Sequence, residues 1–328
     1  MKKYLLKNHG TVFITALLFA ALLASCDQPQ ENATPPAKTA TTKTVATADV
    51  VTAQPQATED SSKTTSPTTA DIVALYNAMH GAANQQPDDA PKDQYGEPYI
   101  IGNLGGFPVN LPASVVSFVE YDDSPGWDIE KLRNYNPPNR NYNSIIESFS
   151  YQLRYTDSSL LDNKSNWHIY KKESEMSKNP WVLVGISSGS RNYKIEHPRD
   201  DFLNDDIERG YRGQSPPYTK DEINTFWGLE RYFIPGINPQ NGIPWRQHMS
   251  ADDIFVSRDT NGHINTYIIC SNNEVPHPPC EHYFTMSGGL KADVSLLYDR
   301  QILSDWSQIQ KIVEKSIYNF TAFSTYAK

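Results

Sequence analysis

Hydrophobic residues in the second half of the chain recur mostly with the period of β-strands. Within the segment 145–155, apolar side chains at every second position from Phe149 to Tyr155 alternate with polar ones, the pattern of an antiparallel strand with one buried face. Further segments rich in β-branched and aromatic residues predict strands at 115–121, 181–186, 229–234, 264–270, 281–286 and 292–298. Asn261 and Gly262 predict a hairpin turn ahead of the strand that begins at residue 264.

The last part of the chain changes to the period of a helix. Apolar residues recur there at steps of three and four, at Ile302, Trp306, Ile309, Val313, Ile317 and Phe320. This spacing predicts a helix from about Leu303 to Phe320 whose apolar face covers the sheet. The expected fold class is therefore α+β, mainly an antiparallel β-sheet or sandwich with a C-terminal amphipathic helix packed on it. The segment 191–206 contains Pro198, many charges and no helical apolar period, so no helix is expected there.

The N-terminus has the pattern of a bacterial lipoprotein signal peptide. Three lysines precede an uncharged run that ends at Ala24 and is shorter than a membrane-spanning helix. Residues 23–26 (Leu-Ala-Ser-Cys) resemble a lipobox, in which the cysteine is lipidated and becomes the first residue of the mature protein. We expect residues 1–25 to be removed and acyl chains on Cys26 to anchor the protein to a membrane in the periplasm. Asp27 resembles an inner-membrane retention signal of enteric bacteria, but this sorting rule varies between lineages, so the choice of inner or outer membrane stays open.

The chain after the signal peptide divides into three further regions. Residues 26–70 are rich in Thr, Ala and Pro, and after Cys26 they contain no aromatic residue, Leu, Ile or Met, so they predict a disordered tether. As a flexible coil this tether spans roughly 35 to 40 Å. Residues 71–94 predict a short helix, with Asp71 as its N-cap, and a proline-rich connector. Residues 95–328 predict the β-rich globular domain.

Composition excludes several classes of protein. The formal net charge of −9 argues against a nucleic-acid binder. Three cysteines are too few for a miniprotein held by a disulfide framework, and 23 prolines with 17 glycines argue against a long helical bundle. What remains is an exported globular domain whose activity the composition does not name.

Cys270 and Cys280 flank a segment rich in proline and asparagine. An oxidising compartment favours a disulfide that closes this loop. The alternative is a metal site, because His277 and His282 lie beside Cys280 and four nitrogen and sulfur ligands suit zinc or copper. The spacing is not that of a known metal motif, so we expect the disulfide and neither a metal nor another cofactor.

Residues 185–189 (Gly-Ile-Ser-Ser-Gly) fit the G-x-S-x-G pattern of a serine nucleophile elbow. The elbow requires a parallel strand before the serine and a helix after it, and the sequence predicts neither. We interpret Ser187 as a turn residue at the end of a strand, assign no catalytic residue and expect that the protein is not an enzyme. The aspartate pairs at 122–123, 200–201 and 205–206 are interpreted as acidic surface and not as acid–base or calcium sites.

Short blocks of the sequence resemble a known family. Residues 102–109 (GNLGGFPV) and 119–127 (VEYDDSPGW) resemble lipoproteins encoded beside type VI secretion lipase effectors. Residues 279–282 (PCEH), followed by Leu303 and Trp306, are similar to the C-terminal half of the same proteins, known as lipase-immunity or Tli-type proteins. The resemblance extends over about 99–320. It implies a non-enzymatic periplasmic protein that binds a cognate phospholipase toxin and blocks it.

The partner predicted by this resemblance is the lipase toxin itself. Tyr121, Asp122, Asp123 and Trp127 are the candidate contact residues, because Tyr and Trp dominate interface hot spots, although Trp127 could equally lie in the core. Two other classes stay open. An envelope-structural or secretion-associated lipoprotein would explain the anchor and the tether equally well, and a periplasmic serine hydrolase would use Ser187. The sequence does not predict the oligomeric state.

Overall fold

The computed structural model describes residues 86–126, 128–188, 198–210, 215–248 and 251–322. All of them belong to one compact unit, Thr64–Lys328. The signal peptide, Cys26, the tether, the helix expected after Asp71 and Trp127 lie outside the described residues. Within the described ranges, no helix has the length and apolar character needed to cross a membrane.

Strands make up most of the described secondary structure. They are β1 (Ile100–Leu104), β2 (Phe107–Leu111), β3 (Val116–Tyr121), β4 (Ile146–Arg154), β5 (Ser159–Leu160), β6 (Trp181–Ser187), β7 (Thr219–Lys220), β8 (Glu230–Phe233), β9 (Asp252–Arg258), β10 (Ile264–Ser271), β11 (Pro279–Thr285) and β12 (Asp293–Asp299). The α-helices are α3 (Ile129–Asn134), α4 (Trp167–Glu173), α5 (Pro198–Arg209) and α6 (Trp306–Asn319), and the 3-10 helices are η2 (Trp245–Gln247) and η3 (Arg300–Asp305).

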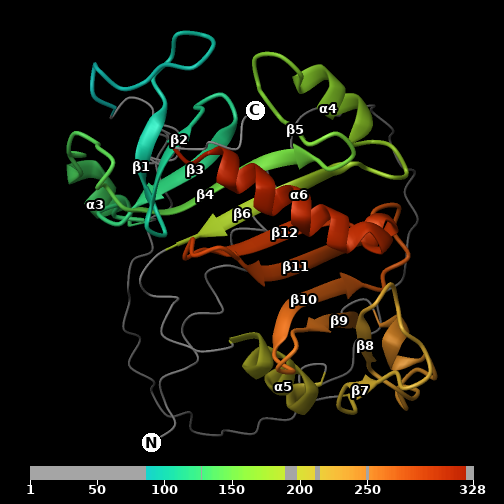
Figure 1. The fold of residues 1–328 in the computed structure, drawn as a ribbon. Coiled ribbons are helices and arrows are strands. Elements are labelled where there is room, and N and C mark those ends of the chain that lie inside the picture. The colour runs from blue at the N-terminus through green and yellow to red at the C-terminus, as the bar shows by residue number, and fades with distance from the viewer. Residues whose placement is uncertain (1–85, 127, 189–197, 211–214, 249–250, 323–328) are drawn as a thin grey trace, which may run out of the picture. The chain divides into compact units, whose positions relative to one another are not determined.

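Ten of these strands form one continuous antiparallel sheet. Its order is β3-β4-β6-β12-β11-β10-β9-β8-β7, with β5 also paired to β4, while β1 and β2 form a separate hairpin. The C-terminal strands β11 and β12 therefore lie in the middle of the sheet, between β6 and β10 (Figure 1). The α+β prediction is confirmed, and of its two alternatives a single sheet is formed and not a sandwich. The β9–β10 hairpin turns at Asn261 and Gly262, as predicted, with a φ of +89° at Gly262.

Helix α6 covers one face of this sheet, as the apolar period near the C-terminus predicts (Figure 1). Ile309, Val313 and Ile317 on α6 are completely buried in the main core. Phe320, just after the helix, packs edge-on against Tyr151 of β4 with ring centroids 5.3 Å apart. Full burial of a side chain of this kind contributes about 1.5–3 kcal/mol, so the stripe is the main attachment of the helix. The helical segment starts slightly earlier than predicted, because η3 precedes α6 directly.

A buried polar network also joins α6 to the sheet. The side-chain oxygen of Gln310 on α6 accepts a hydrogen bond from Thr266 Oγ1 of β10 at 3.0 Å and lies 3.2 Å from His282 Nε2 of β11. The other ring nitrogen of His282, Nδ1, lies 3.3 Å from the hydroxyl of Tyr298 on β12. If the tyrosine donates to Nδ1 and Nε2–H donates to Gln310, both ring nitrogens are satisfied by a neutral imidazole. His282 is completely buried, so these partners replace water.

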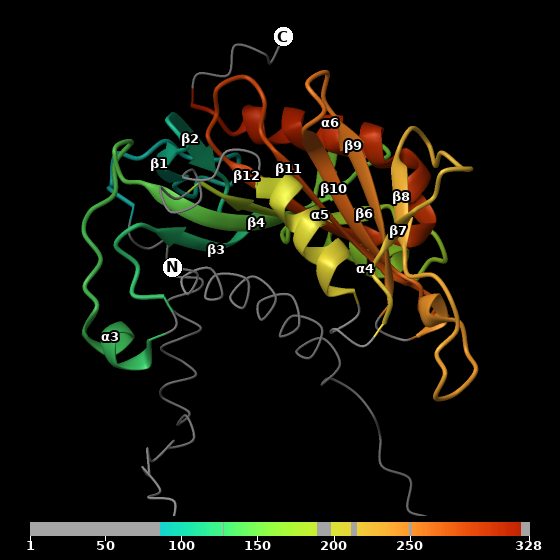
Figure 2. The same ribbon diagram turned by 90° about the horizontal axis from the view of Figure 1, so that it is seen from below.

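Helix α5 lies on the opposite side of the sheet from α6 (Figure 2). Strand residues alternate between the two faces: Phe255 belongs to the core under α6, whereas its neighbours Ile254 and Val256 pack with Leu203 of α5. The expectation that residues 191–206 contain no helix is therefore wrong.

The reason for this error lies in polar contacts that a hydrophobic period does not reveal. Pro198 is the first residue of α5, where its missing N–H costs no helical hydrogen bond, and the first-turn aspartates suit the helix dipole. Asp200 accepts a hydrogen bond from the Ile264 N–H at 2.9 Å and lies 2.8 Å from His263 Nδ1. Arg199 donates to Thr285 Oγ1 at 2.7 Å. The helix is held as much by these side chains as by its short apolar face.

The β1–β2 hairpin packs beside the end of α6. The Asn110 N–H of β2 donates to the Phe320 carbonyl at 2.8 Å. Gly105 in the hairpin turn has a φ of +54°, and a Cβ there would lie 2.3 Å from the Lys291 carbonyl oxygen, so a side chain does not fit. The Gln86 side chain accepts a hydrogen bond from the Ile101 N–H at 3.0 Å, so the packed structure begins before residue 95.

We expect acid to destabilise the protein through His282. Burial lowers the pKa of this imidazole from 6.5 to about 3, although the hydrogen bond with Gln310 opposes the shift. The unfolded chain therefore takes up a proton near pH 6.5 that the folded chain excludes, and the free energy of unfolding falls as pH decreases from 6.5 towards 3. At about 1.4 kcal/mol per pKa unit, the loss reaches up to about 5 kcal/mol. Urea unfolding across this pH range measures it.

His282→Gln supplies the test of this assignment. The variant retains a hydrogen-bonding side chain that does not titrate, so its stability should depend less on pH, even though repacking lowers its stability at neutral pH. His168→Gln, on the exposed surface of α4, should leave the pH dependence unchanged. Equal pH dependence in the wild type and His282→Gln would contradict the prediction.

Candidate functional site

The predicted partner-binding turn after β3 is built on a buried tyrosine. Tyr121 is only 3% exposed, and its hydroxyl donates to the Ile101 carbonyl at 2.8 Å. The guanidinium of Arg140 lies over its ring, 3.8 Å from the centroid, and donates to Asp123 Oδ1 at 2.9 Å. Strand β3 therefore points the side chain of this candidate contact residue into the core, where it has little surface to offer a partner. Asp122 and Asp123 are exposed.

Ser187 lies in the ladder of the sheet and not on a nucleophile elbow. It is the last residue of β6, and its register partners are Ser148 of β4 and Asp293 of β12, both in antiparallel strands. A nucleophile elbow instead follows a parallel strand. The prediction of a turn at Ser187 is also wrong, since the residue is still part of the strand.

Cys270 and Cys280 are joined by a disulfide that links β10 directly to β11. The two cysteines are register partners and completely buried. The two histidines of the alternative metal site have other neighbours: His277 Nδ1 lies 2.6 Å from Asp299 Oδ2, and His282 belongs to the network under α6. In the part of the chain that the structure describes, no cluster of His, Cys, Asp or Glu could hold a metal ion.

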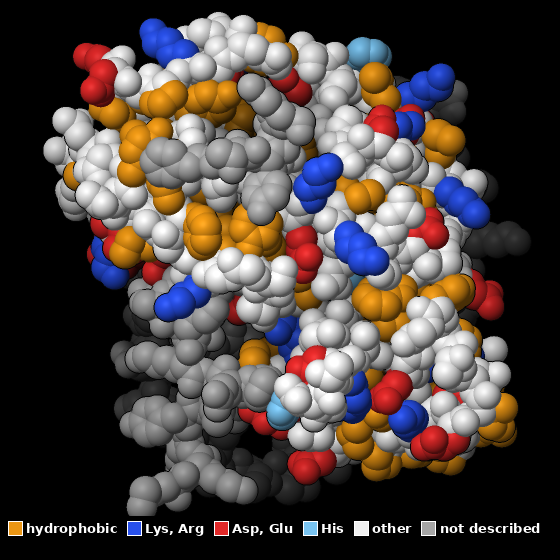
Figure 3. Space-filling model, in the orientation of Figure 1, with side chains coloured by type: hydrophobic (Ala, Val, Ile, Leu, Met, Phe, Trp, Pro, Cys, Tyr) orange, Lys and Arg blue, Asp and Glu red, His pale blue; other side chains and the backbone are white. Residues whose placement is uncertain are grey.

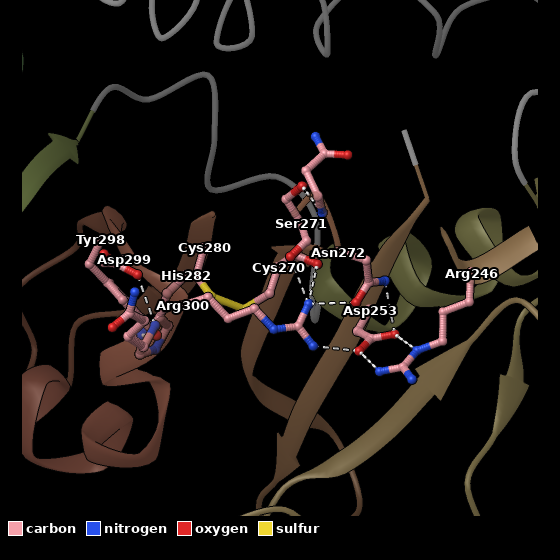
Figure 4. Close-up of a disulfide and its surroundings, with 12 residues drawn as sticks. Arg246, Asp253, Cys270, Ser271, Asn272, Cys280, His282, Tyr298, Asp299 and Arg300 are labelled. Atoms are coloured by element: carbon pink, nitrogen blue, oxygen red, sulfur yellow. Dashed lines mark hydrogen bonds and ion pairs between the residues drawn. A yellow bond between two sulfur atoms is a disulfide. The ribbon is translucent and has the colours of Figure 1, made fainter. Parts of the chain in front are cut away.

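A buried carboxylate between two arginines lies beside this disulfide (Figure 4). Asp253 of β9 is completely buried, and Arg246 of η2 donates to both of its oxygens, at 2.8 and 2.6 Å. Arg300 of η3 donates to Asp253 Oδ2 at 2.6 Å and to the Ser271 carbonyl at 2.7 Å. Burial alone would raise the pKa of Asp253, but the hydrogen bonds from both arginines lower it. The charged carboxylate therefore ties η2 and η3 to the sheet.

Asp252, the preceding residue, has the opposite environment. It points to the other face of the sheet. Burial and the nearby carboxylates of Glu281 and Asp253 raise its pKa to about 6. On β9, the surroundings thus stabilise the charged form of Asp253 and destabilise the charged form of Asp252.

An exposed tryptophan occupies a tight turn between β7 and β8. The Leu229 N–H donates to the Phe226 carbonyl at 2.9 Å and the Phe226 N–H donates to the Leu229 carbonyl at 3.1 Å. Between them, Trp227 and Gly228 have φ values of +54° and +84°, as the two central residues of a type I′ turn do. That turn prefers Asn or Asp followed by Gly, and a bulky residue in the left-handed region is an outlier that costs about 1–2 kcal/mol. Trp227 is nevertheless 53% exposed.

The turn that carries Trp227 is fixed on both sides. The Trp306 indole, at the start of α6, donates to the Trp227 carbonyl at 3.0 Å. Phe226 packs edge-on against buried Phe255, with ring centroids 6.0 Å apart. The Arg231 guanidinium lies over the Phe226 ring, 4.1 Å from its centroid. The backbone of the turn is therefore attached to the core while the Trp227 side chain projects from it.

Sequence reasoning did not single out Trp227. The available signal was an aromatic residue followed by glycine just before the strand predicted at 229–234, which is a possible hairpin turn with Trp in place of Asn or Asp. Ile223 in the same β7–β8 segment is 90% exposed. In Figure 3, hydrophobic side chains gather on this face of the molecule between α6 and β8.

Comparison with known proteins yields only weak similarities. No protein-family model matches the chain, and no curated protein matches it. Smlt3025, an immunity protein of the Stenotrophomonas maltophilia type IV secretion system, is similar in structure with a TM-score of 0.41 and 14% identity, over 72% of this chain and 100% of that one. FrpD, an iron-regulated outer membrane lipoprotein of Neisseria meningitidis, is similar with a TM-score of 0.36 and 10% identity, over 67% and 91% of the two chains.

We expect Asp253→Ala to destabilise the protein by about 1.5–3 kcal/mol, the size of hydrogen bonds to a charged group, because Arg246 and Arg300 lose their shared buried counter-charge but remain 39% and 22% exposed to water. Asp252→Asn is the matched control on the adjacent residue. It removes a carboxylate whose charged form is already disfavoured, so at neutral pH it should leave the stability unchanged or increase it. Urea unfolding of both variants measures the difference. Similar losses in the two variants would contradict the structural assignment.

Proposed function

We propose that the protein is a periplasmic, membrane-anchored immunity protein that binds and inhibits a cognate type VI secretion phospholipase effector. The observation that carries this proposal is where the blocks resembling lipase-immunity lipoproteins lie in the fold. Residues 102–109 form the β1–β2 hairpin, and residues 279–282 lie in β11 at the centre of the sheet.

Individual residues in these blocks have structural roles that restrict their identity. A Cβ on Gly102 would lie 2.7 Å from the Ile146 side chain, and one on Gly105 would meet the Lys291 backbone. Cys280 and His282 supply the disulfide and the buried network under α6. The resemblance thus falls on residues that determine this scaffold, which supports a shared fold and leaves the toxin-contacting residues free to differ.

The lipobox and tether supply the remaining support for the proposal. A toxin that attacks membrane lipids from the periplasm acts at the membrane surface. An inhibitor anchored through Cys26 by a tether spanning roughly 35 to 40 Å would be concentrated at that surface. Inhibition by binding requires an interface of about 1,600 Å² in total and no catalytic group.

The other functions have less support. A serine hydrolase would need Ser187 on an elbow, and this residue is instead paired within an antiparallel ladder. An envelope-structural lipoprotein would explain the anchor and the tether, but not the resemblance of the scaffold blocks to lipase-immunity proteins.

We expect the full chain, purified in detergent, to suppress the lipase encoded beside its own gene at a near-stoichiometric ratio. Tight inhibitors reach nanomolar dissociation constants, about −12 kcal/mol, so the complex should remain intact in size-exclusion chromatography. Ser187→Ala should leave inhibition unchanged, because the proposal gives this hydroxyl no chemical role. Phospholipid hydrolysis by the protein itself that Ser187→Ala abolishes would favour the hydrolase. Absence of both binding and hydrolysis would favour the envelope-structural lipoprotein.

We expect Cys26→Ser to abolish lipid attachment. The substitution removes the thiol that the proposed lipobox would modify, so labelled fatty acid should no longer be incorporated and the protein should leave the membrane fraction. Protection of cells from the lipase should weaken, because the inhibitor is no longer concentrated at the membrane. Cys280→Ser provides a control, since it alters a different cysteine and should retain labelling. Continued labelling of Cys26→Ser would overturn the lipobox assignment.

A further inference from the structure

We propose that Trp227 is the anchor by which this protein docks to its toxin, filling an apolar pocket that has a basic rim on the toxin surface. This inference rests on the proposed function and names the surface that performs it. It starts from the conformation of the turn. A tryptophan occupies a position where asparagine would be less strained, and its side chain is half exposed, so folding does not explain the choice of residue.

The surroundings of Trp227 suit an interface anchor. Trp and Tyr are enriched among hot spots, because they bury a large area and have few rotatable bonds to immobilise. The Trp227 backbone is held by the Trp306 indole on one side and by the packing of Phe226 on the other. Ile223, four residues earlier in the same segment, is another exposed apolar side chain, with 90% of its surface accessible. A rigid projecting side chain loses little conformational entropy when it enters a pocket.

Charges around the turn indicate the partner's chemistry. The basic side chains of this region are already bound to carboxylates: Lys220 and Arg258 to Glu230, at 3.1 and 3.2 Å, and Arg231 to Asp221. By contrast, Glu222 and Asp305 take part in no salt bridge within the described ranges. Glu222 is exposed, whereas Asp305, which directly precedes Trp306, is half-buried and accepts a hydrogen bond from the Tyr155 hydroxyl at 2.9 Å. The surroundings of the anchor are therefore acidic, and a complementary partner surface carries Lys or Arg around its pocket.

The same charges decide between a protein and a lipid surface. An exposed Trp and Ile on a membrane-anchored protein could also enter the headgroup region of a bilayer. Bacterial membranes are anionic, and membrane-binding surfaces of this kind use unpaired Lys or Arg. The surroundings of the turn instead carry Glu222 and Asp305, two carboxylates that form no salt bridge within the described ranges and that an anionic membrane repels. A protein pocket with a basic rim therefore fits better.

Trp227→Asn separates binding from folding. Asn followed by Gly is the preferred sequence for this turn, and the variant retains the main-chain carbonyl that Trp306 binds. We expect its melting temperature to equal or exceed that of the wild type, whereas its affinity for the lipase encoded beside the gene falls about 30-fold or more, the size of a hot-spot effect. Trp167→Asn is the matched control, because Trp167 on α4 is 47% exposed. Its affinity should change less than about threefold.

A charge variant tests the rim. Glu222→Lys should slow association with the same lipase several-fold and weaken the dependence of the association rate on salt, because it removes an attractive charge. Glu175→Lys, an exposed acid that follows α4, should leave both unchanged.

The full chain, reconstituted in vesicles that contain brominated phosphatidylglycerol, tests the lipid alternative. The fraction of tryptophan fluorescence quenched should be no larger in the wild type than in Trp227→Asn. Extra quenching that Trp227→Asn removes would show membrane contact and overturn the proposal. If the wild type binds the lipase and Trp227→Asn binds equally well, this surface is excluded while the proposed function stands. If the wild type does not bind the lipase, the proposed function fails and this inference fails with it.

Discussion

The packing of α6 onto the sheet is the interaction on which the rest of the structure depends. A ten-stranded sheet exposes a wide apolar face, and α6 covers the middle of it with Ile309, Val313 and Ile317. Apolar packing alone would let the helix slide along such a face. The hydrogen bonds of Gln310 to β10 and β11 fix its position, because any shift would leave His282 buried without its partner. Hydrophobic burial thus supplies most of the free energy, and the polar network supplies the register.

The strand order makes this attachment a constraint on the whole chain. Strands β11 and β12, close to the C-terminus, lie between β6 and β10, so the two halves of the sheet meet only when the last strands are in place. The disulfide between Cys270 and Cys280 and the Asp253 cluster reinforce that central region. Arg300 matters particularly, because it lies in η3, immediately before α6, and binds both Asp253 and the Ser271 carbonyl. The start of α6 is therefore held by a buried ion cluster as well as by its own core residues.

The sequence predicted those parts of the fold that hydrophobic burial determines. The period-two strands, the Asn261-Gly262 turn and the face of α6 all follow from which side chains must avoid water. Helix α5 was missed because Asp200 and Arg199 attach it through hydrogen bonds to partners distant in the chain. Tyr121 was named as a candidate contact residue because its residue type is common in interfaces, although its place in β3 buries it. Trp227 was not singled out because the features that distinguish it are its φ angle and its exposed side chain, and the hydrophobic pattern of the sequence reveals neither.

The sequence therefore predicted the buried scaffold better than it predicted the surface. Where local preferences and tertiary packing agree, as in α6, the sequence is sufficient to predict the structure. Trp227 is a position where they disagree: turn chemistry favours asparagine, and burial gains little from a half-exposed indole. The attachment of the turn to Trp306 and Phe255 holds the disfavoured conformation in place. The rigid core that α6 completes therefore does more than stabilise the fold, because it also presents a strained aromatic side chain to solvent in a fixed orientation. A strained, half-exposed residue on such a support contributes little to stability, which is the basis for proposing that Trp227 binds a partner.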